Sequence, residues 1–289
     1  MVVGETQYIW FGSRSDVIKI WLISDVHWMS RGCDEVLFNK TLKEIENDPY
    51  SFWIGLGDYV DLVGYNDKRF DANCLADWVK IEHLGQLGQI GRQHMKEKFS
   101  PIKHKCLGLL LGNHEVKYMQ HNQQEDWHAW LCTELGVQNL GYSCMFRLIF
   151  KRTVAKYPVL SKKSGKNGFA RAYTIFAHHG AGASTTRGGK TNRMSKFMSD
   201  FDADIFLMGH VHEQVPVPKV RLGIDSVGKN IAERQQMGLI NGSLLRTYES
   251  GPRVGYGEMK GYSPVQLGMA SLEFTPDKGV IDVRTRIGG

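Results

Sequence analysis

Five short stretches of the sequence place metal-ligating side chains directly after strand-sized apolar runs. They read DVH at 25–27, GD at 57–58, GNHE at 112–115, HHG at 178–180 and GHVH at 209–212. Carboxylate, imidazole and amide oxygen ligands suit Mn, Fe or Zn, and no stretch contains a cysteine for a thiolate site. The residue types therefore predict a site for divalent ions.

The spacing within the stretches adds to this prediction. Asp25 and His27 are separated by one residue, as are His210 and His212, so in an extended segment the two side chains of each pair would point the same way. A carboxylate that bridges two ions holds them about 3.5–4 Å apart, where both can bind a phosphoryl group during in-line displacement. Taken together, the stretches favour a two-metal centre over five unrelated strand ends.

The elements that must position these residues are visible as apolar runs. Six runs have the length of buried strands and are followed within a residue or two by Gly, Asp, Asn or His. They are Val17–Ile23, Phe52–Leu56, Leu107–Leu111, Tyr173–Ala177, Asp204–Met208 and Met237–Ile240. Helical patterns lie between several of them, which predicts an α/β layered fold with a parallel or mixed sheet. Ligands of such sheets bind beyond the carboxyl ends of the strands, where the five stretches would meet.

The helices are predicted from caps and apolar periodicity. Asp34 is expected to cap a helix that runs to about Asn47, with Val36, Leu37 and Ile45 on its apolar side. Three further helical stripes are expected at Leu75, Trp78 and Val79, at Trp127, Trp130 and Leu131 (ended by Gly136), and at Met194, Phe197, Met198 and Phe201.

Composition is that of a soluble globular protein. The chain has 289 residues, 42% of them apolar, and no run approaches the ~20 apolar residues that span a bilayer. Its five cysteines are widely spaced and form no CxxC pair, so we expect buried thiols in a reducing cytoplasm. We expect one domain over 1–289 with loop insertions at about 151–171 and 213–262, and no membrane partner. The oligomeric state stays open.

The net charge of +6 is unevenly distributed. The block from Lys151 to Ser199 contains eleven Lys or Arg and no Asp or Glu. Such a block is usually a solvated face. Because this one also contains the two adjacent histidines, a polyanionic partner such as a nucleic acid is the alternative interpretation.

In this fixed order the five stretches resemble the motifs of the calcineurin-like metallophosphoesterase superfamily. The resemblance implies a four-layer α/β/β/α sandwich with two mixed sheets. It also implies two divalent metal ions, with Mn expected and Fe, Zn or Mg as alternatives. The segment INGSL at 240–244 resembles the Gly-Ser-containing strand that often follows the last motif.

The resemblance also implies roles for individual residues. By motif position the expected metal ligands are Asp25, His27, Asp58 (bridging both ions), Asn113, His179, His210 and His212. A metal-bound hydroxide would attack phosphorus, and His114 would stabilise the transition state or protonate the leaving oxygen. Neighbouring side chains of an extended segment point to opposite sides, so only one histidine of the HHG stretch is expected to bind metal. We expect His179 to be the ligand and His178 to touch substrate, with the reverse assignment as the alternative.

Departures from these motifs limit which branch of the superfamily the sequence resembles. Leu62 follows GDYVD and Leu111 precedes GNHE, where Ser/Thr protein phosphatases carry arginines that grip the substrate phosphate. The sequence therefore resembles the phosphodiesterase and nuclease branches more closely. The expected function is hydrolysis of a phosphodiester, or of a phosphomonoester.

Two alternatives remain at this point. A DNA-repair-type nuclease could follow the nucleic-acid backbone with its lysine cluster, Lys162, Lys163, Lys166 and Arg171. A non-catalytic scaffold of the same fold is less favoured, because every expected ligand and His114 are present.

Overall fold

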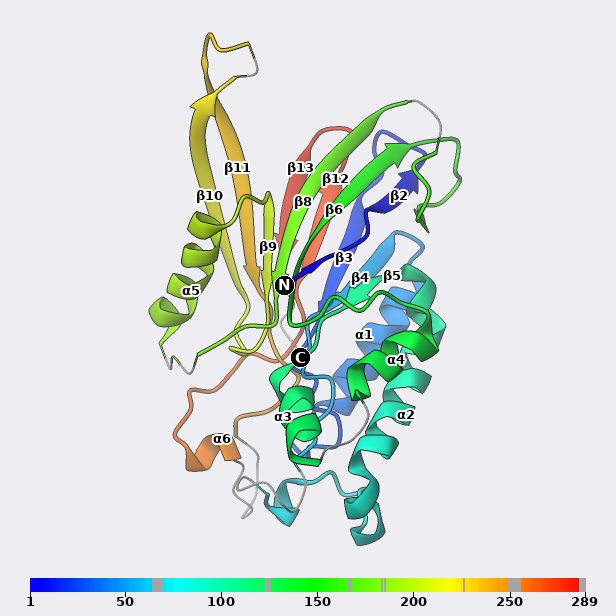
Figure 1. Cartoon of the computed structure of the whole chain (residues 1–289), viewed down its shortest axis with the longest axis vertical. Coiled ribbons are helices and arrows are strands. Elements are labelled where there is room, and N and C mark those ends of the chain that lie inside the picture. The colour runs from blue at the N-terminus through cyan, green and yellow to red at the C-terminus, as the bar shows by residue number, and fades with distance from the viewer. Residues whose placement is uncertain are drawn as a thin grey trace.

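Two β-sheets lie face to face at the centre of the computed structural model (Figure 1). The structure describes residues 1–63, 70–122, 126–165, 168–182, 184, 186–225, 227–248 and 256–285. Lys166 of the expected lysine cluster and parts of both expected insertions lie outside these residues.

The smaller sheet has five strands. Its order is β13 (Val280–Arg284), β12 (Ser271–Thr275), β3 (Ile18–Ile23), β4 (Ser51–Gly55) and β5 (Cys106–Leu109). The strands β3, β4 and β5 run parallel, whereas β12 is antiparallel to both of its neighbours. Because β3, β4 and β5 are parallel, their carboxyl ends lie at one edge of the sheet, as the sequence predicted.

The larger sheet has eight strands. Its order is β10 (Val215–Ile224), β11 (Ile231–Ile240), β9 (Ile205–Met208), β8 (Ala170–His178), β6 (Ser143–Arg152), β2 (Gln7–Phe11) and β7 (Val159–Ser161), with β1 (Val2–Val3) also paired to β6. The strands β8, β9 and β11 run parallel, and β6 is antiparallel to β8. All six strands expected from the apolar runs are present.

Helices cover the outer face of each sheet. The helices are α1 (Glu35–Asn47), α2 (Leu87–Phe99), α3 (Asn113–Asn122), α4 (Trp127–Leu135), α5 (Arg187–Asp200) and α6 (Tyr256–Met259). Short 3-10 helices occupy Ala72–Cys74, Ile81–Gln86 and Ser100–Lys105. Figure 1 shows α1, α2 and α4 beside the five-stranded sheet and α5 beside the eight-stranded sheet.

Three apolar layers separate the four structural layers. One cluster, which includes Phe52 and Leu207, fills the space between the sheets. Another, around Phe38 and Phe99, joins the five-stranded sheet to its helices, and a third, around Met194, joins α5 to the eight-stranded sheet. The α/β/β/α sandwich with two mixed sheets is therefore confirmed. Among the helices of the described residues, none is both long and apolar enough to cross a membrane.

Local helix signals were mostly accurate. Asp34 caps α1 by accepting from the N–H of Leu37, and Gly136 ends α4 with a left-handed φ of 67°. The face assigned to Val36 was wrong, because its side chain is 79% exposed.

The helix expected from Leu75, Trp78 and Val79 was also wrong. Leu75 is extended and forms an isolated bridge with Ser30, and the chain turns at Asp77 and Trp78. Trp78 and Val79 still pack on the core, so burial produced a helix-like spacing without a helix.

Candidate metal centre

The five stretches meet at the carboxyl ends of β3, β4, β5, β8 and β9. Their side chains form three overlapping groups whose candidate ligand atoms lie within 4.8 Å of one another. The groups are Asp25, His27 and His212; His27, Asp58 and His114; and Asp58, His179 and His210. Strands from both sheets supply them, so the site lies where the two sheets meet.

The first group brings three candidate ligand atoms together. The Nε2 atom of His212 lies 3.2 Å from Oδ1 of Asp25 and 3.3 Å from Nε2 of His27. Asp25 and His27 are buried, and His27 Nδ1 has no hydrogen-bond partner among the described residues. One carboxylate and two imidazoles thus converge on a small volume.

The third group, joined by Asn113, also brings candidate ligand atoms together. The Nε2 atom of His179 lies 3.3 Å from Oδ2 of Asp58 and 3.0 Å from Oδ1 of Asn113. The same side-chain atom of Asn113 lies 2.7 Å from Nδ1 of His210, so that only acceptors surround it. Such acceptors can be satisfied by the amide NH2 of Asn113 turned inward, by a proton on His179 Nε2, or by a cation.

Outer hydrogen bonds set the tautomers of two histidines. His179 Nδ1 lies 2.6 Å from the carbonyl oxygen of Leu56, and His210 Nε2 lies 3.1 Å from that of Gly182. A carbonyl can only accept, so these nitrogens donate. The opposite ring nitrogens face the other candidate ligand atoms, and each can bind a cation through its lone pair when it carries no proton, as in protein metal sites. The residues present fit a pair of divalent cations.

The protonation states agree with this fit. Burial, together with His114 and His212, lowers the pKa of His27 to about 3, so its imidazole is neutral. Burial acts to raise the pKa of Asp25 and of Asp58, but the adjacent histidines His212 and His179 outweigh it and hold both carboxylates ionised. Burial likewise opposes protonation of His179, yet Asp58 raises its pKa to about 9. The carboxylates that retain this proton would equally favour a divalent ion in its place.

The backbone at the expected metal ligands has an unusual conformation. Six non-glycine residues have a left-handed φ in the described chain: Asp25, His27, Met29, Asp58, His210 and His212. Five of the six are expected ligands. The expectation that Asp25–His27 and His210–His212 are extended was therefore wrong, since these four residues have φ between 50° and 71°. Tight loops, and not strand alternation, aim the side chains inward.

Glycines allow these loops to approach each other. A Cβ on Gly112 would overlap the backbone nitrogen and the carboxylate of Asp58. Gly180 has φ of 128°, and a Cβ there would overlap the Cβ of His210. The glycines beside the metal-ligating residue types thus serve the packing of one loop against another.

The two adjacent histidines diverge as neighbours on a strand should. His179 is fully buried in the cluster. His178 points to the other side, where Nδ1 accepts from the N–H of Gly180 at 2.8 Å and the ring packs on Phe197 with centroids 4.8 Å apart. It does not line the cavity described below, so this placement gives no support to the expected substrate contact of His178.

Asp61, to which no role had been assigned, holds the expected catalytic histidine. His114 Nδ1 lies 2.8 Å from Oδ1 of Asp61, and the backbone N–H of His114 donates to Asp58 at 2.9 Å. The second carboxylate of GDYVD was the available signal. It was ambiguous because the sequence alone does not indicate which way it points.

Glu115 is a buried anchor for the loop after β4. Its carboxylate accepts backbone N–H bonds from Asp58, Tyr59, Val60 and Gly112, at 2.7–3.3 Å. Burial and the nearby Asp58 raise the pKa of Glu115 to about 7, whereas the four donors favour the ionised form.

The segment at 240–244 anchors the loop after β3. Ser243 Oγ donates to the carbonyl oxygen of Asp25 at 2.9 Å, and the N–H of Leu244 donates to the same oxygen at 3.1 Å. Asn241 Nδ2 donates to Ser24 Oγ at 2.9 Å. The resemblance of INGSL to a family strand thus corresponds to a physical role in fixing Asp25.

A cavity of about 520 Å³ opens beside the cluster. His27, Asp58, Asn113, His114 and His212 line its inner end. Loops around residues 30–32, 71–75, 245–247 and 257–265 form further parts of its wall. This volume lies in the range of small-molecule sites.

Most of the lysine cluster lies away from this cavity. Lys162 pairs with Glu5 at 3.3 Å, and Arg171 Nε donates to the carbonyl oxygen of Pro276 at 2.7 Å. Arg171 precedes His178 by seven residues along β8, which corresponds to about 23 Å. Figure 1 shows this end of β8 far from α3. Of the basic block, Lys190 on α5 does line the cavity.

Comparisons with solved structures give distant similarities. A single-site mutant of Vps29 from Entamoeba histolytica has TM-score 0.39 and 11% identity, over 94% of this chain and 100% of that chain. A metallophosphoesterase from Sphaerobacter thermophilus has TM-score 0.38 and 12% identity, over 93% and 87%. A conserved uncharacterized protein from Streptococcus pneumoniae TIGR4, described as a predicted phosphoesterase, has TM-score 0.33 and 12% identity, over 94% and 99%. At these TM-scores the similarities carry no argument about activity.

Sequence comparison is decisive for the family. No curated protein matches the chain significantly. Residues 18–214, however, match the family model of calcineurin-like phosphoesterases, and this span contains all five stretches. The chain belongs to the calcineurin-like phosphoesterase family.

Proposed function

We propose that the protein is a metal-dependent phosphoesterase that hydrolyses a small phosphodiester, or a phosphomonoester, in the cavity beside the cluster. The observation that carries the proposal is the convergence of seven metal-ligating side chains and the His114–Asp61 pair on one side of that cavity.

The ligand roles are part of the proposal. Asp25, His27 and His212 would hold one ion; Asn113, His179 and His210 would hold the other; and Asp58 would contact both. Carboxylate, imidazole and amide oxygen donors make Mn our first choice, with Fe, Zn or Mg as alternatives. When bound, such ions neutralise phosphoryl oxygens and lower the pKa of water.

The remaining residues donate a proton or hold other residues in position. Asp61 accepts from His114 Nδ1 and would stabilise a protonated imidazole, so His114 can donate from Nε2 to the leaving oxygen. The N–H of His114 and the carboxylate of Glu115 hold Asp58 and its loop in place.

Two observations favour a small substrate over a nucleic-acid backbone. The cavity volume of about 520 Å³ suits a small molecule, and Lys162 and Arg171 lie at the far end of β8. The scaffold alternative is less favoured because all the expected ligands and His114 are present and converge.

The test is a substrate panel on protein stripped with EDTA and reloaded separately with Mn, Fe, Zn or Mg. We expect hydrolysis of bis(p-nitrophenyl) phosphate or p-nitrophenyl phosphate, and little cleavage of single-stranded or duplex DNA. Preferential cleavage of DNA would support the nuclease alternative. Absence of hydrolysis with any metal would support the scaffold.

The variant Asp58→Asn tests the assignment of the metal ligands. Because Asp58 lies in two of the three groups, we expect kcat to fall at least about 100-fold and bound metal to fall below two ions per chain. Asp282→Asn, an exposed position on β13, is the control and should behave as wild type. Near-normal turnover in Asp58→Asn would refute the assignment.

A further inference from the structure

Among the residues that the structure describes, four cationic side chains line the cavity: Arg31, Lys117, Lys190 and Arg246. Three of them have partners. Arg246 pairs with Asp34, Lys190 lies 3.1 Å from Glu213 and is 11% exposed, and Arg31 donates to the carbonyl oxygen of Asn73 at 3.1 Å. Lys117 is exposed, and no ion pair or side-chain hydrogen bond joins it to another described residue. Its ammonium group is available to a ligand.

The position of Lys117 on α3 brings it close to the cluster. It follows Asn113 by four residues and His114 by three, so all three lie on one face of the helix. Long helical side chains lean towards the N-terminus of their helix and cover the preceding turn. The turn before Lys117 is the one that carries Asn113 and His114.

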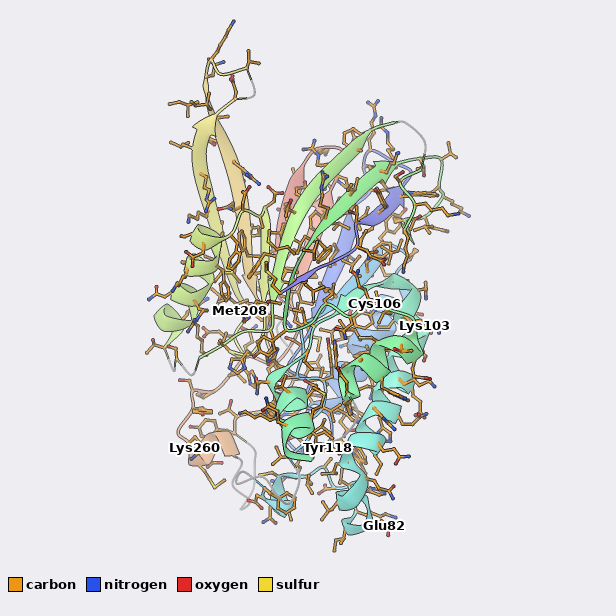
Figure 2. The ribbon with its side chains drawn as sticks, viewed as in Figure 1. Glu82, Lys103, Cys106, Tyr118, Met208 and Lys260 are labelled. Atoms are coloured by element: carbon orange, nitrogen blue, oxygen red, sulfur yellow. The ribbon has the colours of Figure 1, made fainter. Side chains whose placement is uncertain are left out.

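Buried neighbours fix the rotation of α3. Glu115 is buried against the loop after β4. Tyr118, labelled in Figure 2, is also buried, and its hydroxyl accepts from the N–H of Gly88 at 3.2 Å. These residues lie about 200° and 100° from Lys117 around the axis. Because both residues are anchored in the protein, the helix face that carries Lys117 is turned towards the cavity.

We propose that Lys117 is a substrate-positioning residue, whose ammonium group binds anionic oxygens of the phosphoester held at the cluster. A lysine binds phosphate as a point charge, and of the four cationic side chains Lys117 is the one without a partner among the described residues. The contact favours esters with more negative charge, so it selects phosphomonoester dianions over diester monoanions. The inference rests on the proposed function for its substrate but can be tested by binding alone.

The experiment compares Lys117→Met, which keeps the length and removes the charge, with Lys117→Arg, which keeps the charge. Lys103→Met is the control, because Lys103 is exposed on the far side of the helical layer and does not line the cavity (Figure 2). Calorimetry measures binding of inorganic phosphate to each Mn-loaded protein. Steady-state kinetics measures kcat and KM for p-nitrophenyl phosphate and bis(p-nitrophenyl) phosphate.

We expect Lys117→Met to weaken phosphate binding about tenfold and to raise KM for the monoester by a similar factor. The change for the diester should be smaller, with kcat and bound metal close to wild type. Lys117→Arg should recover most of the binding. Unchanged phosphate binding in Lys117→Met, or an equal loss in Lys103→Met, would overturn the proposal. If wild type binds phosphate through Lys117 but hydrolyses no ester, the proposed function fails and the anion site stands.

Discussion

At the scale of single residues, the candidate centre is held in a strained geometry. Asp25, His27, Asp58, His210 and His212 adopt left-handed φ values that cost of order 1–3 kcal/mol each for non-glycine residues. Such conformations persist only where surrounding contacts over-determine them. Here the N–H groups of Asp25 and His27 donate to the carbonyl oxygens of Gly57 and Asp58, respectively. The contacts prearrange the candidate ligand atoms.

The His114–Asp61 pair leads to a prediction at this scale. Asp61→Asn should lower kcat by about 10–100-fold, because the imidazole loses the carboxylate that supports its protonated form. The loss should be greater for phenyl esters than for p-nitrophenyl esters, since a poor leaving group depends more on proton donation. Steady-state rates on both ester series measure this difference.

The control is the double variant with His114→Gln. If the two residues act as a unit, the double variant should be little slower than His114→Gln alone. Multiplicative losses, or equal losses for both leaving groups, would show that Asp61 acts in another way.

At the scale of elements, buried polar groups on one element fix the loop of another. Glu115 on α3 holds the loop after β4 through four backbone N–H bonds. Ser243, after β11, similarly holds the loop after β3 through the carbonyl oxygen of Asp25. The loops therefore depend on partners from other parts of the chain for their conformation.

Glu115→Gln tests this dependence. The substitution places an amide NH2 against N–H donors, so we expect the free energy of unfolding to fall by about 1–3 kcal/mol. Urea denaturation in EDTA measures it without the contribution of metal. The control is Glu97→Gln, whose exposed carboxylate accepts from Gln93. Equal stability of Glu115→Gln and wild type would show that the four bonds are not needed to hold the loop.

At the scale of the whole molecule, the candidate centre joins the two sheets. Asp25, Asp58 and Asn113 follow strands of the five-stranded sheet, and His179 and His210 follow strands of the eight-stranded sheet. The inter-sheet apolar layer already holds the sheets together, and bound ions would add a second connection at the carboxyl edge.

Metal removal should therefore lower thermal stability. An ion present at 100 times its Kd stabilises the folded state by about 2.7 kcal/mol, which for a chain of this size corresponds to a Tm increase of about 5 °C. Scanning calorimetry with Mn and with EDTA measures the shift, and Asp58→Asn should reduce it. A Tm independent of Mn would contradict the assignment of the centre.

Much of the architecture was determined by local sequence. Six apolar runs became strands, Asp34 capped α1, and Gly136 ended α4, because an apolar run and a helix cap can each be recognised within a few residues of the chain. The metal-ligating residue types were also readable, since each stretch follows directly on a strand.

Tertiary structure decided what depends on distant partners. Leu75 became extended because it pairs with Ser30, and the roles of Asp61 and Lys117 emerged only once α3 lay against the loop after β4. Asp25 and His212 are far apart in sequence yet 3.2 Å apart in space. Residue types and spacing along the chain identify which groups can do chemistry, whereas the order of strands and the conformation of the loops determine which of them meet.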